Sequence, residues 1–272
     1  MTPRNNLTDT HVHLDRYEPE ELSGALERTR EVGLRWIVTA GMDLPSSQRA
    51  VELARAHERV LAAVGIHPWV AAEDFPKDFH EELYRLAQEP VTVAIGEVGI
   101  DYVDNVFSGV TYHDNPTLRN AQDKAFRKQI ALACEVSLPL TTHCRGAYES
   151  FVPILTEERA NRVGGAVHNY EADLETAKKL LDMGFLLSFG GTITYPEQTA
   201  LREVVRQIPL DGILLETDSP YMPLYQQTTD QNEPANVAQV ASTLAEIKGI
   251  DVKELIDAVY ENFRTLLKLT GQ

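Results

Sequence analysis

Short apolar runs alternate with amphipathic stretches along nearly the whole chain. Eight of the apolar runs have the length and composition of strands, and they cover Asn6–His13, Leu34–Ala40, Val60–Gly65, Val91–Gly96, Leu138–Cys144, Val163–Val167, Phe185–Phe189 and Gly212–Glu216. Several of them, among them VTVAIG and GILLE, are almost continuously apolar. That pattern is typical of parallel strands that other elements cover on both faces.

Between these runs, and after the last of them, apolar residues recur with the period of a helix. These stretches predict helices over Glu20–Val32, Ser46–Ala56, Phe79–Gln88, Ala121–Glu135, Tyr148–Leu155, Leu174–Met183, Glu197–Gln207, Pro234–Lys248 and Val252–Lys268. Strand–helix alternation repeated eight times, with no linker-like stretch, predicts an α/β fold in which residues 1–272 form a single (β/α)8 TIM-barrel domain. An open, doubly wound sheet is the alternative.

The charge balance restricts the partners of this protein. Among its 272 residues, 25 are Lys or Arg and 41 are Asp or Glu, which gives a formal net charge of −16. Such a charge disfavours duplex nucleic acid and anionic membranes, although bound cations can still attract a phosphate-bearing substrate. Two cysteines are too few for a disulfide framework, and no apolar stretch has the character of a secretion signal or a membrane span. We therefore expect a cytoplasmic protein with no membrane partner and an oligomeric state that the sequence leaves open.

Imidazole and carboxylate side chains gather where the predicted strands end. They are, in chain order, His11, His13, His67, Glu97, His143, His168 and Asp218. Because the carboxyl ends of barrel strands meet at one face, we expect these side chains to converge there. Imidazole together with carboxylate suits Zn, Mn, Fe or Ni, and six such ligands are enough for two metal ions that share one carboxylate. A single histidine at a strand end is commonly structural, but burying the whole set without a cation would leave several polar groups unsatisfied.

Several segments of the chain resemble the signature segments of TatD-like metal-dependent hydrolases. They are Thr8–Asp15, Gly65–Pro68, Ala94–Tyr102, His143–Arg145 and Leu215–Tyr221, and the likeness runs from about residue 8 to residue 267. The resemblance implies a distorted barrel, a two-metal site and hydrolysis of phosphoesters, in some members at DNA ends. It also implies which side chains hold each ion: His11, His13 and Asp218 for the first, His143 and His168 for the second, and Glu97 as the bridge.

The ligand set predicts a mechanism. A water between two divalent cations becomes a hydroxide near neutral pH and attacks the ester, while Asp218 serves as general base and Glu97 holds both ions. The expected substrate-binding residues are His67, Arg145, Tyr102 and Tyr170. Arg145 suits bidentate contact with a phosphate. Glu216, two residues before Asp218 on the same strand face, is expected to hold a ligand or the following loop in place.

The chain departs from the family pattern near the expected mouth of the site. Glu171 adds an acidic group after His168, and Gln231 replaces a cation that the family usually has there. Both changes favour a small or single-stranded phosphoester over duplex DNA. An amidohydrolase or lactonase, in which Glu171 and Arg145 bind the amine and carboxylate of a small substrate, is the alternative. A binding or scaffold protein with purely structural metals is a third hypothesis.

Overall fold

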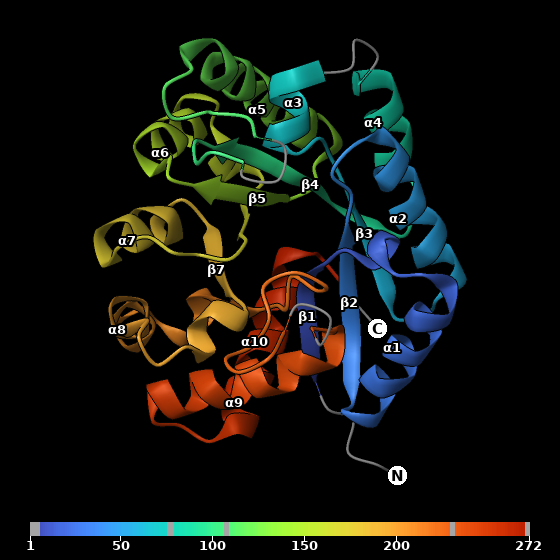
Figure 1. The fold of residues 1–272 in the computed structure, drawn as a ribbon, viewed down its shortest axis with the longest axis vertical. Helices are drawn as coiled ribbons and strands as arrows, with labels where there is room; N and C mark the ends of the chain where they lie inside the picture. Colours follow the sequence, from blue (N-terminus) through green and yellow to red (C-terminus); the bar gives the residue numbers. More distant parts are fainter. Residues whose placement is uncertain (1–5, 75–78, 106–108, 229–231, 270–272) are drawn as a thin grey trace.

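Eight parallel strands form one sheet whose spatial order follows their order in the sequence (Figure 1). The computed structural model describes residues 6–74, 79–105, 109–228 and 232–269. The strands are β1 (Leu7–Val12), β2 (Leu34–Ala40), β3 (Val60–Val64), β4 (Thr92–Asp101), β5 (Leu140–Arg145), β6 (Gly165–Val167), β7 (Phe185–Phe189) and β8 (Ile213–Leu215). This arrangement confirms the predicted TIM-barrel fold.

The barrel closes just beyond the end of β8. The N–H group of His13 donates to the carbonyl of Ser219 at 2.8 Å, and the N–H group of Asp218 donates to the carbonyl of His11 at 2.9 Å. These two bonds join β1 to the segment after β8. The closing seam therefore consists of residues that also carry the expected metal ligands.

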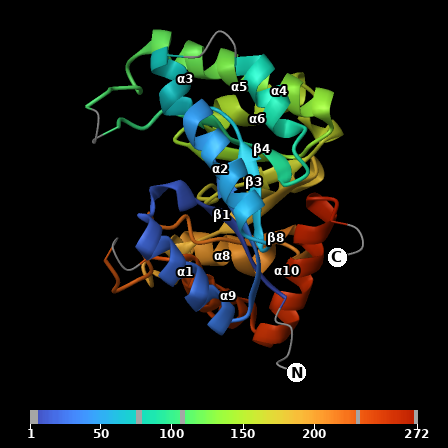
Figure 2. The same ribbon diagram turned by 90° about the vertical axis from the view of Figure 1, so that its right-hand side faces the viewer.

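Helices surround the sheet on the outside (Figures 1 and 2). They are α1 (Pro19–Glu31), α2 (Leu44–Ala56), α3 (Pro68–Asp74), α4 (Phe79–Ala87), α5 (Pro116–Val136), α6 (Tyr148–Glu157), α7 (Leu174–Asp182), α8 (Thr199–Gln207), α9 (Val237–Lys248) and α10 (Val252–Leu266). None of these helices, over the part of the chain described, combines the length and apolar character needed to cross a bilayer.

Three elements differ from the sequence-based expectation. β4 continues to Asp101 instead of ending at Gly96, and α5 begins at Pro116, where the side chain of Asn115 caps it by accepting the N–H of Leu118 at 3.2 Å. α3 has no counterpart among the predicted helices. It begins at Pro68, because proline fits the first turn of a helix although it interrupts the apolar pattern.

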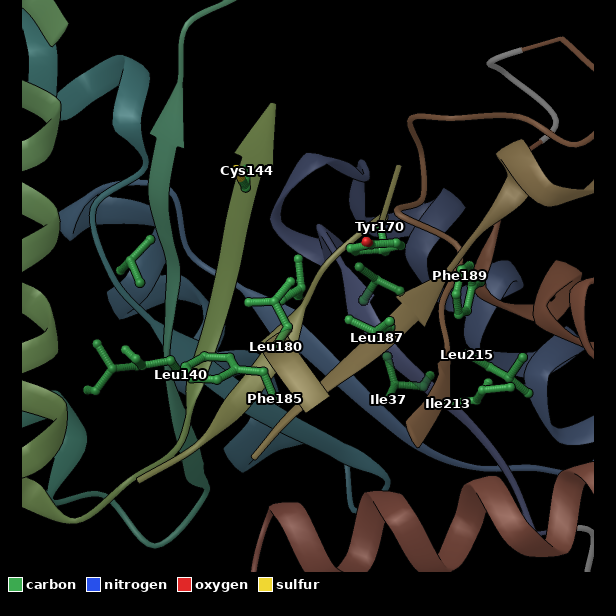
Figure 3. Packing of buried hydrophobic residues seen from close by; sticks show 14 of the residues in the cluster. Ile37, Leu140, Cys144, Tyr170, Leu180, Phe185, Leu187, Phe189, Ile213 and Leu215 are labelled. Atoms are coloured by element: carbon green, nitrogen blue, oxygen red, sulfur yellow. The ribbon is translucent and has the colours of Figure 1, made fainter. Parts of the chain in front are cut away.

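Apolar residues of β8 alternate between two layers. Ile213 and Leu215 belong to the layer between sheet and helices, where Figure 3 shows them near Leu187. Leu214 between them belongs to a second cluster that also contains Phe263 of α10. Alternate residues of a strand face the same side, so Glu216 and Asp218 follow Leu214 on the inner face. The interior is therefore apolar at the amino ends of the strands and polar at their carboxyl ends.

Candidate metal centre

The carboxylate of Glu97 lies among imidazoles at the carboxyl ends of the strands. Its Oε2 atom lies 3.4 Å from Nε2 of His11 and 3.5 Å from Nε2 of His13. Its Oε1 atom lies 2.9 Å from Nδ1 of His143 and 3.9 Å from Nε2 of His168. One buried carboxylate thus faces nitrogen atoms from β1, from β5 and from the end of β6.

Asp218 completes the cluster from the end of β8. Its Oδ1 atom lies 3.4 Å from Nε2 of His13, and its Oδ2 atom lies 3.7 Å from Nε2 of His168. The backbone of Asp218 has a φ of 53°, in the left-handed region that Asp and Asn adopt more readily than other non-glycine residues. This conformation, together with the bond from its N–H to the carbonyl of His11, directs the carboxylate into the cluster.

Three subsets of these side chains offer ligand atoms within 4.8 Å of one another. They are His11–His13–Asp218, His11–Glu97–His168 and His67–Glu97–His143. The first subset is the one expected to hold the first ion. The second ion is expected between His143 and His168, whose ring centroids lie 6.0 Å apart and whose nitrogens both face Oε1 of Glu97.

Oxygen acceptors behind two of the imidazoles fix their orientation. Nδ1 of His13 lies 3.1 Å from the carbonyl oxygen of Ala40, and Nδ1 of His168 lies 2.8 Å from Oε1 of Glu216. A ring nitrogen that faces such an acceptor carries the proton, so the lone pair of Nε2 is directed into the cluster. This is the arrangement that metal-binding histidines usually have. Glu216 thus stands behind a candidate ligand.

Asp101 stands behind His143 in the same way, and the sequence analysis missed it. Its Oδ2 atom lies 3.0 Å from Nε2 of His143, on the far side of the ring from Glu97. Burial acts to raise the pKa of Asp101, but hydrogen bonds from His143 and Arg145 outweigh it and hold the pKa low. The sequence does contain an indication of this role, because Asp101 lies four residues after Glu97 and would face the same side of a strand. The argument holds only if the strand continues past Gly96.

His67 has the opposite arrangement. Its Nδ1 atom accepts the backbone N–H of Trp69 at 3.2 Å, so that nitrogen uses its lone pair outside the cluster. Burial lowers the pKa of this imidazole, and in the neutral ring the proton then resides on Nε2, which lies 3.5 Å from Oε1 of Glu97. His67 therefore presents a hydrogen-bond donor to the centre, whereas His13 and His168 present lone pairs.

The cluster fits a cation. Both ring nitrogens of His11 are buried and have no hydrogen-bond partner among the described residues, which would be costly unless an ion binds there. Burial acts to lower the pKa of His168, but Glu216 and Asp218 outweigh it and raise the pKa to about 10, so the carboxylates around this ring favour a positive charge that either a proton or a bound cation supplies. Burial acts to raise the pKa of Glu97, but His67 and His11 outweigh it and hold the pKa well below its usual range. The pKa of Asp218 is lowered as well, so Glu97 and Asp218 are ionised and attract positive charge.

A glycine allows the strands that carry the ligands to approach one another. Gly99 on β4 has a φ of 146°, and a Cβ atom built there would lie 1.9 Å from the carbonyl oxygen of His143. A side chain at this position would push β5 away from β4 and His143 away from Glu97.

The expected substrate-binding residues lie in different environments. Arg145 is at the rim, where its Nη2 atom lies 3.0 Å from Oδ2 of Asp101 and its side chain is 36% exposed. Tyr102 and Tyr170 are buried, and their hydroxyl groups donate to Asp123 and to the carbonyl of Asp173. Figure 3 shows Tyr170 within the apolar layer beside β7, so neither tyrosine is brought to the cluster.

The other side chains that the sequence places near the mouth of the site differ in their exposure to solvent. Tyr221 is 41% exposed, and its ring centroid lies 5.5 Å from that of His13. Glu171 is exposed, and Gln231 lies outside the described residues. Tyr221 therefore places an aromatic side chain that solvent reaches beside a candidate ligand.

A family model and several known proteins match nearly the whole length of this chain. The family model described as TatD related DNase matches residues 8–268. A Bacillus subtilis protein named uncharacterized metal-dependent hydrolase YabD is 36% identical over 264 residues, which cover 97% of this chain and 99% of that protein. A Pantoea ananatis protein named 3'-5' ssDNA/RNA exonuclease TatD is 32% identical over 270 residues, covering 97% of each.

The fold has a similar match among solved structures. The crystal structure of YJJV, a TatD homologue from Escherichia coli, superposes with a TM-score of 0.87 at 28% identity. The superposition covers 96% of this chain and 98% of that chain.

Proposed function

Because the chain belongs to the family of TatD-related DNases and is a metal-dependent hydrolase, we propose that it hydrolyses phosphoester bonds with two divalent cations. The observation that carries this proposal is the convergence of His11, His13, His168 and Asp218 on Glu97, with neither ring nitrogen of His11 hydrogen-bonded to any residue that the structure describes. Three separate strand ends supply these groups, and a purely structural role would not require their polar atoms to face one another.

We assign His11, His13 and Asp218 to one cation and His143 and His168 to the other, with Glu97 between them. The mixture of imidazole and carboxylate suits Zn, Mn, Ni or Fe better than Mg or Ca, which prefer oxygen ligands. When bound, such cations lower the pKa of a coordinated water and polarise the phosphoryl oxygen.

The residues of the chain would then act on protons and on the substrate. Asp218, ionised and 12% exposed at its side chain, is placed to accept the proton of the attacking water. Nε2 of His67, which carries a proton, would donate to an oxygen of the ester. Arg145, held by Asp101 at the rim through Nε and Nη2, would bind a phosphate oxygen with Nη1, the nitrogen that Asp101 does not contact.

The substrate that we propose is a small or single-stranded phosphoester. The Pantoea ananatis relative is named an exonuclease of single-stranded DNA and RNA. A net charge of −16 opposes binding along a duplex, because contact with many phosphates needs an extended basic surface. A strand end that enters the rim presents few phosphates, and the cations and Arg145 can neutralise them.

The proposal is tested by measuring the metal content of the purified protein and its activity on phosphoesters, lactones and N-acyl amino acids. We expect two cations per chain and metal-dependent cleavage of bis-p-nitrophenyl phosphate and of a labelled single-stranded oligonucleotide. His80→Ala is the control for metal content and activity, because His80 is exposed and lies 2.8 Å from Glu135, and neither residue belongs to the candidate ligand groups. Cleavage of lactones or N-acyl amino acids alone would favour the amidohydrolase or lactonase alternative and would exclude this proposal.

A further inference from the structure

Asn232 binds the backbone on both sides of Asp218. This asparagine is 3% exposed, and its Nδ2 atom donates to the carbonyl oxygen of Thr217 at 2.9 Å. The same amide group also donates to the carbonyl oxygens of Tyr221 and Met222. Asp218 lies between these acceptors in a left-handed conformation. The turn that directs its carboxylate is therefore closed by a side chain from another segment.

Other parts of the chain hold Asn232 in place. The hydroxyl of Tyr17 donates to its backbone carbonyl at 3.1 Å, and Nδ2 of Asn236 donates to its Oδ1 atom at 3.1 Å. The next residue, Glu233, accepts both Nε and Nη2 of Arg28, at 2.7 Å and 2.6 Å. Tyr17 follows His13 closely in the chain. Asn232 therefore links the segment after β1 with the segment after β8.

We propose that Asn232 is a positioning residue for the metal centre, an inference that rests on the proposed function. It acts through the backbone of residues 217–222, whose carbonyls it binds, and keeps Asp218 aimed at His13 and the cation that both would hold. Loss of the amide group would leave three carbonyls without this donor and would let the turn at Asp218 relax.

The opposite end of β8 offers a matched control. Nδ2 of Asn262, on α10, donates to the carbonyl oxygens of Leu210 and Ile213, both at 2.9 Å. Asn262 thus makes the same kind of contact as Asn232, but at the amino end of the strand. Changing either asparagine removes one amide and leaves backbone carbonyls without that donor. Only Asn232 contacts the backbone next to a candidate ligand.

The experiment compares Asn232→Ala and Asn232→Asp with Asn262→Ala. Binding of Mn²⁺ is measured from the EPR signal of the free ion, alongside the melting temperature and kcat and KM for bis-p-nitrophenyl phosphate. We expect the Asn232 variants to bind Mn²⁺ about 10- to 100-fold more weakly than the wild type. Their kcat should fall by a larger factor than their KM rises. Asn262→Ala should lower the melting temperature to a similar extent and keep Mn²⁺ affinity within about twofold of the wild type.

Each result decides the proposal. Equal loss of Mn²⁺ affinity in the Asn232 and Asn262 variants, or none in either, would show that Asn232 is only a structural residue. If Asn232→Ala does not fold, Tyr17→Phe removes just one support of Asn232 and should weaken Mn²⁺ binding in the same direction by a smaller factor. An unchanged affinity in Tyr17→Phe would then overturn the proposal.

If the wild type cleaves no phosphoester but the variants of the two asparagines still differ in Mn²⁺ affinity, the positioning role stands and the proposed function fails. A wild type that binds no Mn²⁺ would overturn both.

Discussion

The two ends of the barrel interior are built on the same strands and have opposite chemistry. At the amino ends, Leu61 and Leu214 pack with Phe263 of α10 in an apolar cluster. At the carboxyl ends, the same faces carry imidazoles and carboxylates around Glu97. A few residues along one strand thus separate the part that stabilises the fold from the part that would perform the chemistry. Substitutions at the two ends should therefore change different measured quantities.

The largest effect is expected at the rim, from Asp218→Asn. Asparagine keeps the shape of the side chain and tolerates the left-handed backbone, so the melting temperature should change little. The variant loses the carboxylate that accepts the proton, and kcat should fall about 10²- to 10⁴-fold. Steady-state kinetics on bis-p-nitrophenyl phosphate, with metal content measured in parallel, checks this. Unchanged turnover with the metal still bound would remove Asp218 from the proton transfer.

The reverse pattern is expected at the amino end, from Phe263→Ala. Phe263 is fully buried, and its removal leaves a cavity, so the free energy of unfolding should fall by about 3–5 kcal/mol. The activity of the folded fraction should stay that of the wild type. Val252→Ala, on the same helix at a side chain that is 38% exposed, should cost less than about 0.5 kcal/mol. A loss of kcat in folded Phe263→Ala would show that the two ends are coupled.

The same contrast explains what the sequence could predict. The apolar end follows from periodicity, because LAAVG, VTVAIG and GILLE are runs that only parallel strands of this kind bury on both faces. Residues with metal-binding chemistry at strand ends were also recognisable, since their convergence follows from the barrel itself. The positions of these groups could thus be predicted without knowledge of their contacts.

The contacts behind the ligands could not be predicted in this way. Asp101 was missed because the predicted strand ended at Gly96 and left Asp101 outside it, whereas in the structure β4 continues to Asp101. Tyr102 and Tyr170 were expected in the pocket. Tyr102 follows Asp101 with the opposite strand parity, and its hydroxyl donates to Asp123 of α5. Tyr170 lies beyond the end of β6, and its hydroxyl donates to the carbonyl of Asp173. The tautomer of His67 depends on the N–H of Trp69, which only the fold brings into place.

A smaller effect is expected one step behind the ligands, from Glu216→Gln. The carboxylate of Glu216 lies 2.8 Å from Nδ1 of His168 and accepts the N–H of Asn169 at 2.7 Å. Glutamine keeps an oxygen but loses the charge that orients the ring, so metal affinity should fall about 10- to 100-fold. The measurement is competition for the metal with a chromophoric chelator. Glu203→Gln, at an exposed position on α8, is the control, and an equal loss there would contradict the assigned role of Glu216.

The smallest effect is expected at the edge of the rim, from Arg145→Lys. Lysine keeps the positive charge but loses the planar group that bonds Asp101 through Nε and Nη2. Because Arg145 is partly exposed, solvent weakens its contacts, and KM for bis-p-nitrophenyl phosphate should rise only about three- to tenfold. kcat should change less, because the candidate ligands stay in place, and Arg85→Lys on the exposed face of α4 should change neither value. A fall in kcat at constant KM would instead mean that Arg145 acts on His143 through Asp101. Arg145 would then be a residue that supports the candidate ligands and not one that binds the substrate.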